Sequence, residues 1–234
     1  MSNQFKILKN AKKFSKSSQK WLRRQINDPF VFKAKTEGWR SRSAFKIIEI
    51  DKKFKIFKKD HIVVDLGASP GGWSQFAVKI VGEGRVIAID LLPFDKIAGV
   101  EFVQCDFLAD EAKSSIIDLL KNIPYNQKGK CNVVMSDMAS NSTGNNKADH
   151  LRIINLLEDA LSLSLQILKE DGCFVGKIFQ GGSSKILVEQ LQKHFTKIHY
   201  FKPDSSRKDS SESYLIALGY KGEKILNLAD SAVT

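Results

Sequence analysis

The stretch from Ile62 to Val78 constrains the fold of this chain more than any other part of the sequence. An apolar run that begins at Ile62 ends at Asp65 and leads into a glycine-rich turn over residues 67–72. The residues from Trp73 onward have the character of a helix start. A strand, a glycine turn and a helix in this order bring the backbone close to a nucleotide-like ligand at the carboxyl end of the strand.

The turn differs from the two common phosphate-binding loops. Its glycines lack the G-x-G-x-x-G spacing that cradles a pyrophosphate, and no Gly-Lys-Ser/Thr follows as in a P-loop. We therefore favour a ligand with an adenosine end and an amino-acid end and without phosphates, a description that fits S-adenosylmethionine. The candidate contacts in this turn are Gly67, Gly71 and Gly72. The alternative is an ordinary strand-to-helix turn.

From residue 62 onward the chain alternates between strand-like and helix-like segments. This alternation favours an α/β fold with a mostly parallel sheet, helices on both faces and an antiparallel pair formed by the last two strands. Apolar residues at helical spacing also predict a helix within residues 30–57 that displays Arg40, Arg42 and Lys46. The expected strands are 62–66, 85–90, 100–104, 131–136, 172–178, 197–201 and 213–219, and the other expected helices are 72–81, 110–121, 149–169 and 182–195.

Positive charge is concentrated in the N-terminal quarter of the chain. Residues 1–60 contain 18 Lys and Arg against 5 Asp and Glu, whereas the remaining residues contain 19 against 21. Such a segment is typical of a nucleic-acid footprint, although a solvated lysine-rich start is the alternative. We expect a basic, flexible, RNA-binding extension over 1–28, one domain over 29–221 and a tail over 222–234.

The composition indicates where in the cell the protein is found and argues against disulfide and metal sites. No apolar run approaches the ~18–20 residues that cross a bilayer, and the N-terminus does not resemble a signal peptide. We therefore expect a cytoplasmic protein with no membrane partner. The three cysteines, Cys105, Cys131 and Cys173, are far apart in apolar surroundings, which predicts reduced core thiols and no metal site. Nothing in the sequence demands more than a monomer.

Two acids follow predicted strands at positions suited to an adenosine. Asp90 ends the second strand, where a carboxylate can accept hydrogen bonds from ribose hydroxyls. Asp106 follows the third strand, where it can accept from the adenine amine, and Phe107 or Leu91 can pack on the ring. The alternative for Asp90 is a helix cap or turn residue.

A lysine inside an apolar strand points to catalysis. Lys177 lies between Ile178 and a run of apolar residues, so it needs a partner, and Asp137 at the end of the preceding strand is the obvious one. We expect Lys177 to act as a general base whose pKa is lowered by burial and by the nearby cation Lys46, with Asp137 orienting the amine. A purely structural ion pair is the alternative.

Taken together, these strings resemble the FtsJ-type 2′-O-ribose methyltransferases of ribosomal RNA. The resemblance runs from about residue 21 to residue 219. The matching strings are Arg40-Ser41-Arg42-Ser43-Ala44-Phe45-Lys46, residues 63–75, Asp90-Leu91-Leu92-Pro93, residues 133–138, Lys177-Ile178-Phe179-Gln180-Gly181 and Lys202-Pro203-Asp204-Ser205-Ser206-Arg207.

The resemblance implies a fold, a cofactor and a reaction. The fold is a Rossmann-like, class I S-adenosylmethionine-dependent methyltransferase with seven strands, one of them antiparallel. A catalytic Lys-Asp-Lys-Glu tetrad falls on Lys46, Asp137, Lys177 and Glu212, and the proton acceptor falls on Lys177. Cofactor contacts fall on Gly71, Trp73, Asp90, Asp106 and Asp137. The implied reaction is methylation of a uridine ribose in the A-loop of 23S ribosomal RNA, on the 50S subunit.

Some features depart from the family or remain open. Ser140 replaces a usual proline after Asp137, and Gly176 replaces a larger apolar residue before the base. The polar and basic residues from Lys202 to Lys208 could hold RNA phosphate. Alternatives to the ribosomal substrate are tRNA or a cap structure, and a different class is a non-catalytic ribosome-assembly factor. A nucleotide-dependent oxidoreductase is disfavoured by the absent G-x-G-x-x-G.

Overall fold

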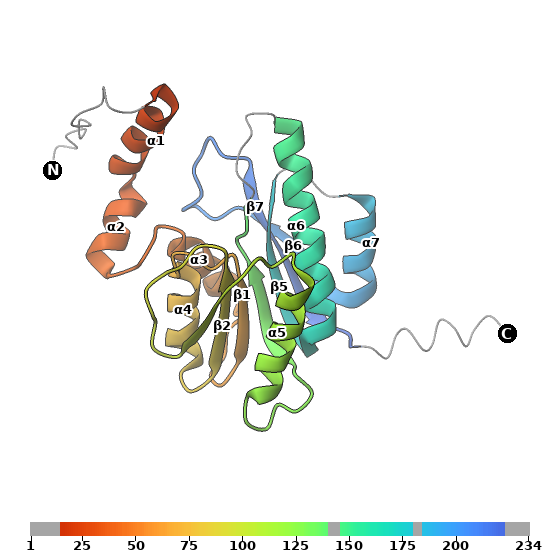
Figure 1. Ribbon diagram of the computed structural model, residues 1–234. Coiled ribbons are helices and arrows are strands. Elements are labelled where there is room, and N and C mark those ends of the chain that lie inside the picture. Colours follow the sequence, from red (N-terminus) through yellow and green to blue (C-terminus); the bar gives the residue numbers. More distant parts are fainter. Residues whose placement is uncertain (1–14, 140–145, 180–183, 223–234) are drawn as a thin grey trace.

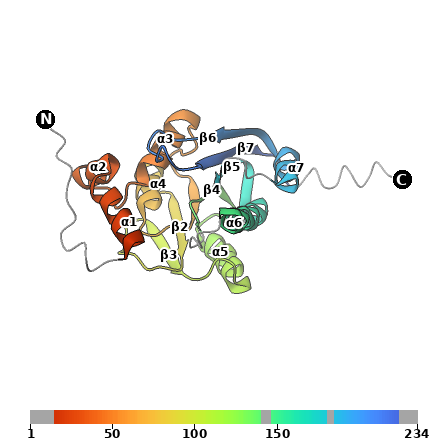
Figure 2. The same cartoon turned by 90° about the horizontal axis from the view of Figure 1, so that it is seen from above.

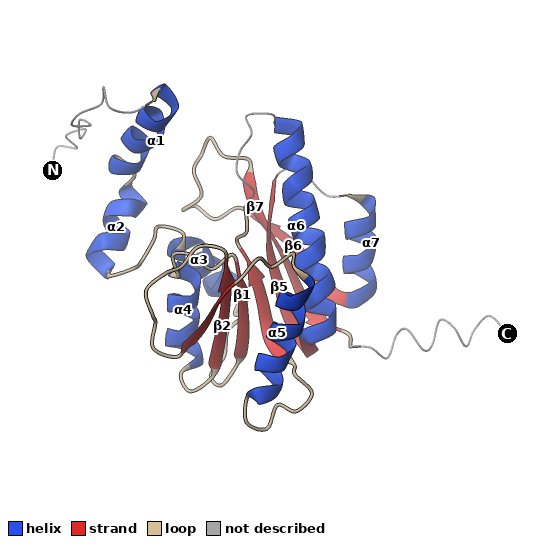
Figure 3. Ribbon diagram, viewed as in Figure 1, coloured by secondary structure: helices blue, strands red, loops and turns tan. Residues whose placement is uncertain are grey.

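A seven-stranded sheet with helices on both faces forms the body of the protein (Figure 3). The computed structural model describes residues 15–139, 146–179 and 184–222. The strands are β1 (Ile62–Leu66), β2 (Arg85–Asp90), β3 (Val100–Gln104), β4 (Cys131–Ser136), β5 (Leu168–Phe179), β6 (Phe195–Phe201) and β7 (Glu212–Tyr220). The helices are α1 (Lys16–Ile26), α2 (Pro29–Glu37), α3 (Ala44–Phe54), α4 (Gly72–Val81), α5 (Asp110–Asn122), α6 (Asn146–Ile167) and α7 (Lys185–His194).

The strand order is β3-β2-β1-β4-β5-β7-β6. All pairs from β3 to β5 are parallel, whereas β7 lies antiparallel to both of its neighbours, β5 and β6. The predicted class, with seven strands and one antiparallel member, is therefore confirmed. The sequence also predicted the β6–β7 pair, but β7 lies inside the sheet between β5 and β6 and leaves β6 at the edge.

Helices cover both faces of the sheet, which explains why its central strands are mostly buried and mostly apolar (Figure 2). Every residue of β1 is buried. One core layer includes Val63, Val133 and Val175 and packs against α3 and α4. The opposite layer includes Val64, Val134 and Phe174 and packs against α5, α6 and α7. The alternation of side chains along each strand therefore fills two separate cores.

The helix predicted within residues 30–57 is two helices. Gly38 adopts a φ of 74° after the last residue of α2, and its N–H caps that helix by bonding to Ala34. Arg40 and Arg42 consequently lie in the connection to α3, not on its surface as predicted, whereas Lys46 lies on α3. The prediction failed because apolar spacing continues across a break that only the backbone conformation at Gly38 reveals.

The basic N-terminal region includes a described helix, α1. Both views place α1 and α2 on the side of the domain that carries α3 and α4 (Figures 1 and 2). Arg24 of α1 pairs with Asp209 at 3.1 Å, and Arg207 donates to Gln25 at 2.9 Å. Within the described residues, none of the helices is both long and apolar enough to cross a membrane.

Candidate active site

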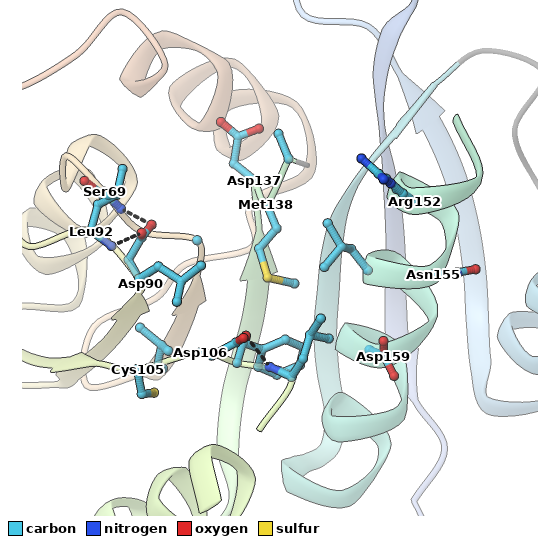
Figure 4. A pocket seen from close by; sticks show the side chains of 17 residues that line it. Ser69, Asp90, Leu92, Cys105, Asp106, Asp137, Met138, Arg152, Asn155 and Asp159 are labelled. Atoms are coloured by element: carbon cyan, nitrogen blue, oxygen red, sulfur yellow. Dashed lines mark hydrogen bonds between the residues drawn. The ribbon is translucent and has the colours of Figure 1, made fainter. Parts of the chain in front are cut away.

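A cavity of about 670 Å³ opens at the carboxyl ends of β1, β2, β3 and β4. Its wall includes Gly67, Asp90, Asp106 and Asp137 from the sheet side, and residues of α6 such as Asn155 form the opposite wall (Figure 4). Ligands of open α/β sheets bind at this edge. Across the described ranges, no group of three or more His, Cys, Asp or Glu side chains is arranged to hold a metal ion.

Both predicted adenosine acids line this cavity. The Asp90 carboxylate accepts the backbone N–H groups of Ser69 and Leu92, each at 2.8 Å (Figure 4). The Asp106 carboxylate accepts the N–H of Leu108 at 2.9 Å. These bonds fix the two carboxylates, and each oxygen retains capacity for a further donor, as ribose hydroxyls or an amine would supply.

The glycine-turn residues do not share one role. Gly67 lines the cavity with a φ of 75°, and a Cβ there would approach the Met138 Cα to 2.9 Å. Gly71 and Gly72 are absent from the cavity wall: a Cβ on Gly71 would meet Ile97, and one on Gly72 would meet Ser41. The close approach at Gly72 therefore serves packing against the segment before α3.

Trp73 is also a packing residue in this structure. It is buried, outside the cavity wall, and its indole N–H donates to the backbone oxygen of Ser43 at 2.9 Å. Its ring lies 5.5 Å from that of Tyr214. Trp73 thus joins α4, the start of α3 and β7 beneath the charged groups described next.

Two lysines and two carboxylates come together where α3, β4, β5 and β7 meet. Lys177 Nζ lies 2.7 Å from Asp137 Oδ1 and 3.8 Å from Glu212 Oε2. Lys46 Nζ lies 2.7 Å from Glu212 Oε1 and 3.8 Å from Asp137 Oδ2. All four predicted members of the tetrad therefore form one alternating cluster, and Asp137 connects it to the cavity.

The cluster includes two hydroxyls that sequence reasoning missed. The fully buried Tyr214 donates its O–H to Asp137 Oδ1 at 2.8 Å. Ser206 donates its O–H to Glu212 Oε1 at 3.1 Å. Tyr214 lies two residues after Glu212 on β7, so the period-two alternation of a strand could have placed both on one face. No local signal could have identified Ser206.

Mutual neutralisation controls the pKa values in the cluster. Burial raises the pKa of Asp137, but Lys177 and Lys46 outweigh it, and the net pKa lies below the ordinary value. Burial lowers the pKa of Lys177, but Asp137 and Glu212 outweigh it, and the net pKa lies above the ordinary value. Burial, reinforced by Asp137, raises the pKa of Tyr214 well above its usual range.

The direction for Lys177 differs from the sequence prediction. We expected burial and the cation Lys46 to lower its pKa. The structure places Lys46 against Glu212, which neutralises that cation, and puts a second carboxylate beside Lys177. The two neighbouring carboxylates therefore favour the protonated form of Lys177.

The two departures from the family pattern have different outcomes. At Gly176 a Cβ would approach Leu157 Cδ1 to 2.2 Å, so a side chain of α6 occupies the space that a larger residue would need. The space beside Lys177 is thus filled from α6. Ser140 lies outside the described residues.

The loop between β6 and β7 uses several of its donors within the protein. From the sequence, the polar and basic residues of this loop could hold RNA phosphate: Lys202, Ser205, Ser206, Arg207 and Lys208. In the structure Lys202 donates to the backbone oxygen of Ser210 at 2.7 Å, and Arg207 contacts Asp28 at 3.3 Å. Their donors are directed to partners within the protein.

Comparison with known proteins supports the assignment that this geometry suggests. Residues 39–220 match the family described as FtsJ-like methyltransferase. The chain belongs to this family. The resemblance stated from the sequence is confirmed, and the matched residues include the glycine turn and all four members of the cluster.

Similar proteins extend over most of the chain. The "Ribosomal RNA large subunit methyltransferase E" of Azorhizobium caulinodans is 48% identical over 219 residues, which cover 92% of this chain and 88% of that protein. The protein of the same name from Rickettsia canadensis is 46% identical and covers 94% of this chain and 96% of its own. The crystal structure of a candidate ribosomal RNA methyltransferase from Plasmodium falciparum has a TM-score of 0.68 and 30% identity, covering 79% of this chain and 100% of its own.

Proposed function

We propose that this protein uses S-adenosylmethionine to methylate the 2′-hydroxyl of a uridine ribose in the A-loop of 23S ribosomal RNA, on the 50S subunit. Membership of a methyltransferase family and the names of relatives such as the Azorhizobium caulinodans protein support a ribosomal RNA substrate. The observation that carries the chemistry is the buried Lys177, held 2.7 Å from Asp137 beside the cavity.

The cavity residues fit the methyl donor. Asp90 and Asp106 would bind the adenosine end, and the backbone at Gly67 can approach a ligand closely because it carries no side chain. S-adenosylmethionine supplies, when bound, a methyl group on a positively charged sulfonium. Asp137, on the wall of the cavity and at the charged cluster, links that ligand to Lys177.

Lys177 is the proposed proton acceptor. An alcohol is a weak nucleophile until a base takes its proton, and a lysine can do so only as a neutral amine. A positive charge brought into the cavity disfavours the protonated form of a neighbouring lysine, which lowers its pKa. The side-chain carboxylate of Asp137 and its backbone carbonyl, which accepts a hydrogen bond from Lys177 Nζ at 2.9 Å, hold the lysine amine in place during the transfer.

The positive charge of the N-terminal quarter of the chain supports an RNA substrate. The excess of Lys and Arg in residues 1–60 provides the electrostatic attraction that a ribosomal RNA requires. A monomer in the cytoplasm, where ribosomal subunits mature, completes the proposal.

The test is transfer of labelled methyl from S-adenosylmethionine to purified 50S subunits that lack the modification, with naked ribosomal RNA and bulk tRNA in parallel. We expect label on an A-loop ribose of the subunit, mapped by resistance of the adjacent bond to alkaline cleavage. Label on tRNA alone would replace the proposed substrate with tRNA. Absence of label on every RNA, with cofactor still bound, would favour a ribosome-assembly factor.

The proposed role of Lys177 is tested with the Lys177→Ala protein. Methyl transfer should be abolished while S-adenosylmethionine binding, measured by calorimetry, persists, because the lysine is absent from the cavity wall. Loss of cofactor binding together with activity would indicate a structural ion pair instead.

A further inference from the structure

Three polar side chains, two from helix α3 and one from the connection before it, contact the loop between β6 and β7, residues 202–211, or its end at Glu212. Lys46 contacts Glu212, where this loop ends. Glu49 lies three residues further along α3 and so on the same side of the helix as Lys46, whereas Arg42 lies in the connection before α3. Arg42 and Glu49 both contact the loop and neither belongs to the tetrad.

Glu49 holds the backbone of the loop. Its carboxylate accepts the N–H of Asp204 at 2.6 Å and that of Ser205 at 3.1 Å. The adjacent N–H of Ser206 bonds to the Pro203 oxygen at 2.9 Å and closes the turn. Hydrogen bonds between a carboxylate and backbone N–H groups are among the stronger kinds, so Glu49 fixes where Ser206 lies.

The same turn is held by a second anchor. The Arg42 guanidinium donates to the Ser205 carbonyl and to the Asp28 carboxylate. Arg207 also donates to Asp28, at 3.3 Å. The loop is therefore fastened both to α3 and to the start of α2.

Ser206 connects the anchored loop to the cluster of two lysines and two carboxylates through Glu212. Its side chain is buried, and its hydroxyl donates to Glu212 Oε1 at 3.1 Å. That same oxygen lies 2.7 Å from Lys46. Oε1 of Glu212 is thus held by Ser206 of the loop and by Lys46 of α3. Oε2, the other oxygen, is directed toward Lys177.

We infer that Glu49 and Ser206 are positioning residues for methyl transfer, which hold Glu212 at a fixed distance from Lys46 and Lys177. Glu49 fixes the loop, and Ser206 fixes the carboxylate. The catalytic meaning of this inference rests on the proposed function, in which Lys177 accepts the proton.

The charge around Lys177 determines what loosening Glu212 does. Lys177 faces Asp137 from β4, Glu212 and Tyr214 from β7, and Lys46 from α3 through the two carboxylates. Asp137 and Glu212 both favour the protonated amine. If Glu212 moves away, the titration midpoint of Lys177 shifts to lower pH, and the amine also loses part of its orientation.

The experiment compares Ser206→Ala and Glu49→Ala with the wild type in two measurements. Nitrogen-15 NMR of the lysine Nζ groups gives the Lys177 midpoint directly, without catalysis. The dependence of kcat on pH gives the plateau rate. We expect both variants to lower the midpoint and to lower the plateau about tenfold, as loss of one hydrogen bond to a charged group would. Glu212→Gln should shift the midpoint in the same direction and further.

Matched controls and a conservative variant separate positioning from folding. Ser211→Ala removes an identical hydroxyl from an exposed position of the same loop and should leave both measurements unchanged. Glu49→Gln keeps one acceptor oxygen and should retain more activity than Glu49→Ala. A fixed Lys177 midpoint in both Ser206→Ala and Glu49→Ala would overturn the inference, even with reduced activity, because misfolding lowers the active fraction without moving a midpoint.

The two proposals fail in different ways. If Lys177→Ala retains methyl transfer, the proposed base is wrong, and the NMR midpoints still decide whether Ser206 and Glu49 position Glu212. If Lys177→Ala is inactive and the midpoints are fixed, the base stands and the positioning role is wrong.

Discussion

The buried carboxyl of Asp65 should make the protein less stable as pH rises through the acid range. Asp65 is fully buried in β1, and its pKa is raised from 3.8 to about 7, first by burial and then, less strongly, by Asp137 and Asp90. Oδ2 accepts the Ser74 hydroxyl at 2.6 Å, whereas Oδ1 has no hydrogen-bond partner among the described residues.

The sign and size follow from proton linkage. Between pH 3.8 and about 7 the folded protein holds a proton on Asp65 that the unfolded chain has lost, so unfolding becomes easier as pH rises. Each pKa unit corresponds to about 1.4 kcal/mol, so the shift at Asp65 removes about 4 kcal/mol of stability across this window. Below 3.8 and above about 7 the contribution is constant.

The perturbation is Asp65→Asn, which keeps the shape and does not titrate. Urea unfolding of both proteins from about pH 4 to pH 8 gives the free energy of unfolding at each pH. The variant should gain about 4 kcal/mol on the wild type over this range, whatever constant cost its amide group introduces. Asp118→Asn, at an exposed position on α5, serves as the control and should run parallel to the wild type. Parallel curves for Asp65→Asn, within about 1 kcal/mol, would refute the reasoning.

Four further outcomes are expected. Because the pKa of Lys177 is raised in the free protein, log kcat/KM should climb with a slope of about one per pH unit from about pH 6 to pH 8, and a flat profile with chemistry rate-limiting would exclude this base. Asp90→Asn should weaken S-adenosylmethionine binding about tenfold by calorimetry, since it replaces a charged acceptor on the cavity wall. Gly67→Ala should cost at least about 1 kcal/mol in urea unfolding, given its φ of 75° and the nearby Met138 backbone. Deleting residues 1–20 should weaken RNA binding and flatten its salt dependence, and an unchanged slope would contradict the footprint.

The strands were predictable because their signals are local. Apolar runs and the glycine turn located β1, β2, β3 and β4 at the observed residues, because the inner strands of a parallel sheet are covered on both faces and are mostly apolar. The boundary between α6 and β5 was less accurate, since the strand follows the helix directly at Leu168 and no turn residue marks the change.

The composition of the candidate site was predictable, but its electrostatics were not. A lysine within an apolar strand, such as Lys177, requires an oppositely charged partner, and Asp137, which follows the neighbouring strand, provides the carboxylate. The pKa of Lys177 depends on Asp137 and also on Glu212. The loop that leads to Glu212 is bonded to a segment more than 150 residues away in the chain, through Glu49 and Asp204. Sequence spacing carries no record of such a contact.

A raised pKa for a proposed base follows from how such a lysine can be buried at all. A neutral amine could lie alone between β4 and β7, but a lysine that must also become positively charged when it accepts a proton needs carboxylates ready to stabilise that product. Asp137 and Glu212 meet this need, and Lys46 meets the corresponding need of the carboxylates. The same charges that stabilise the protonated product therefore favour that form in the free protein, and in the proposed mechanism a cation bound at the Asp137 side of the cavity would shift the balance toward the neutral base.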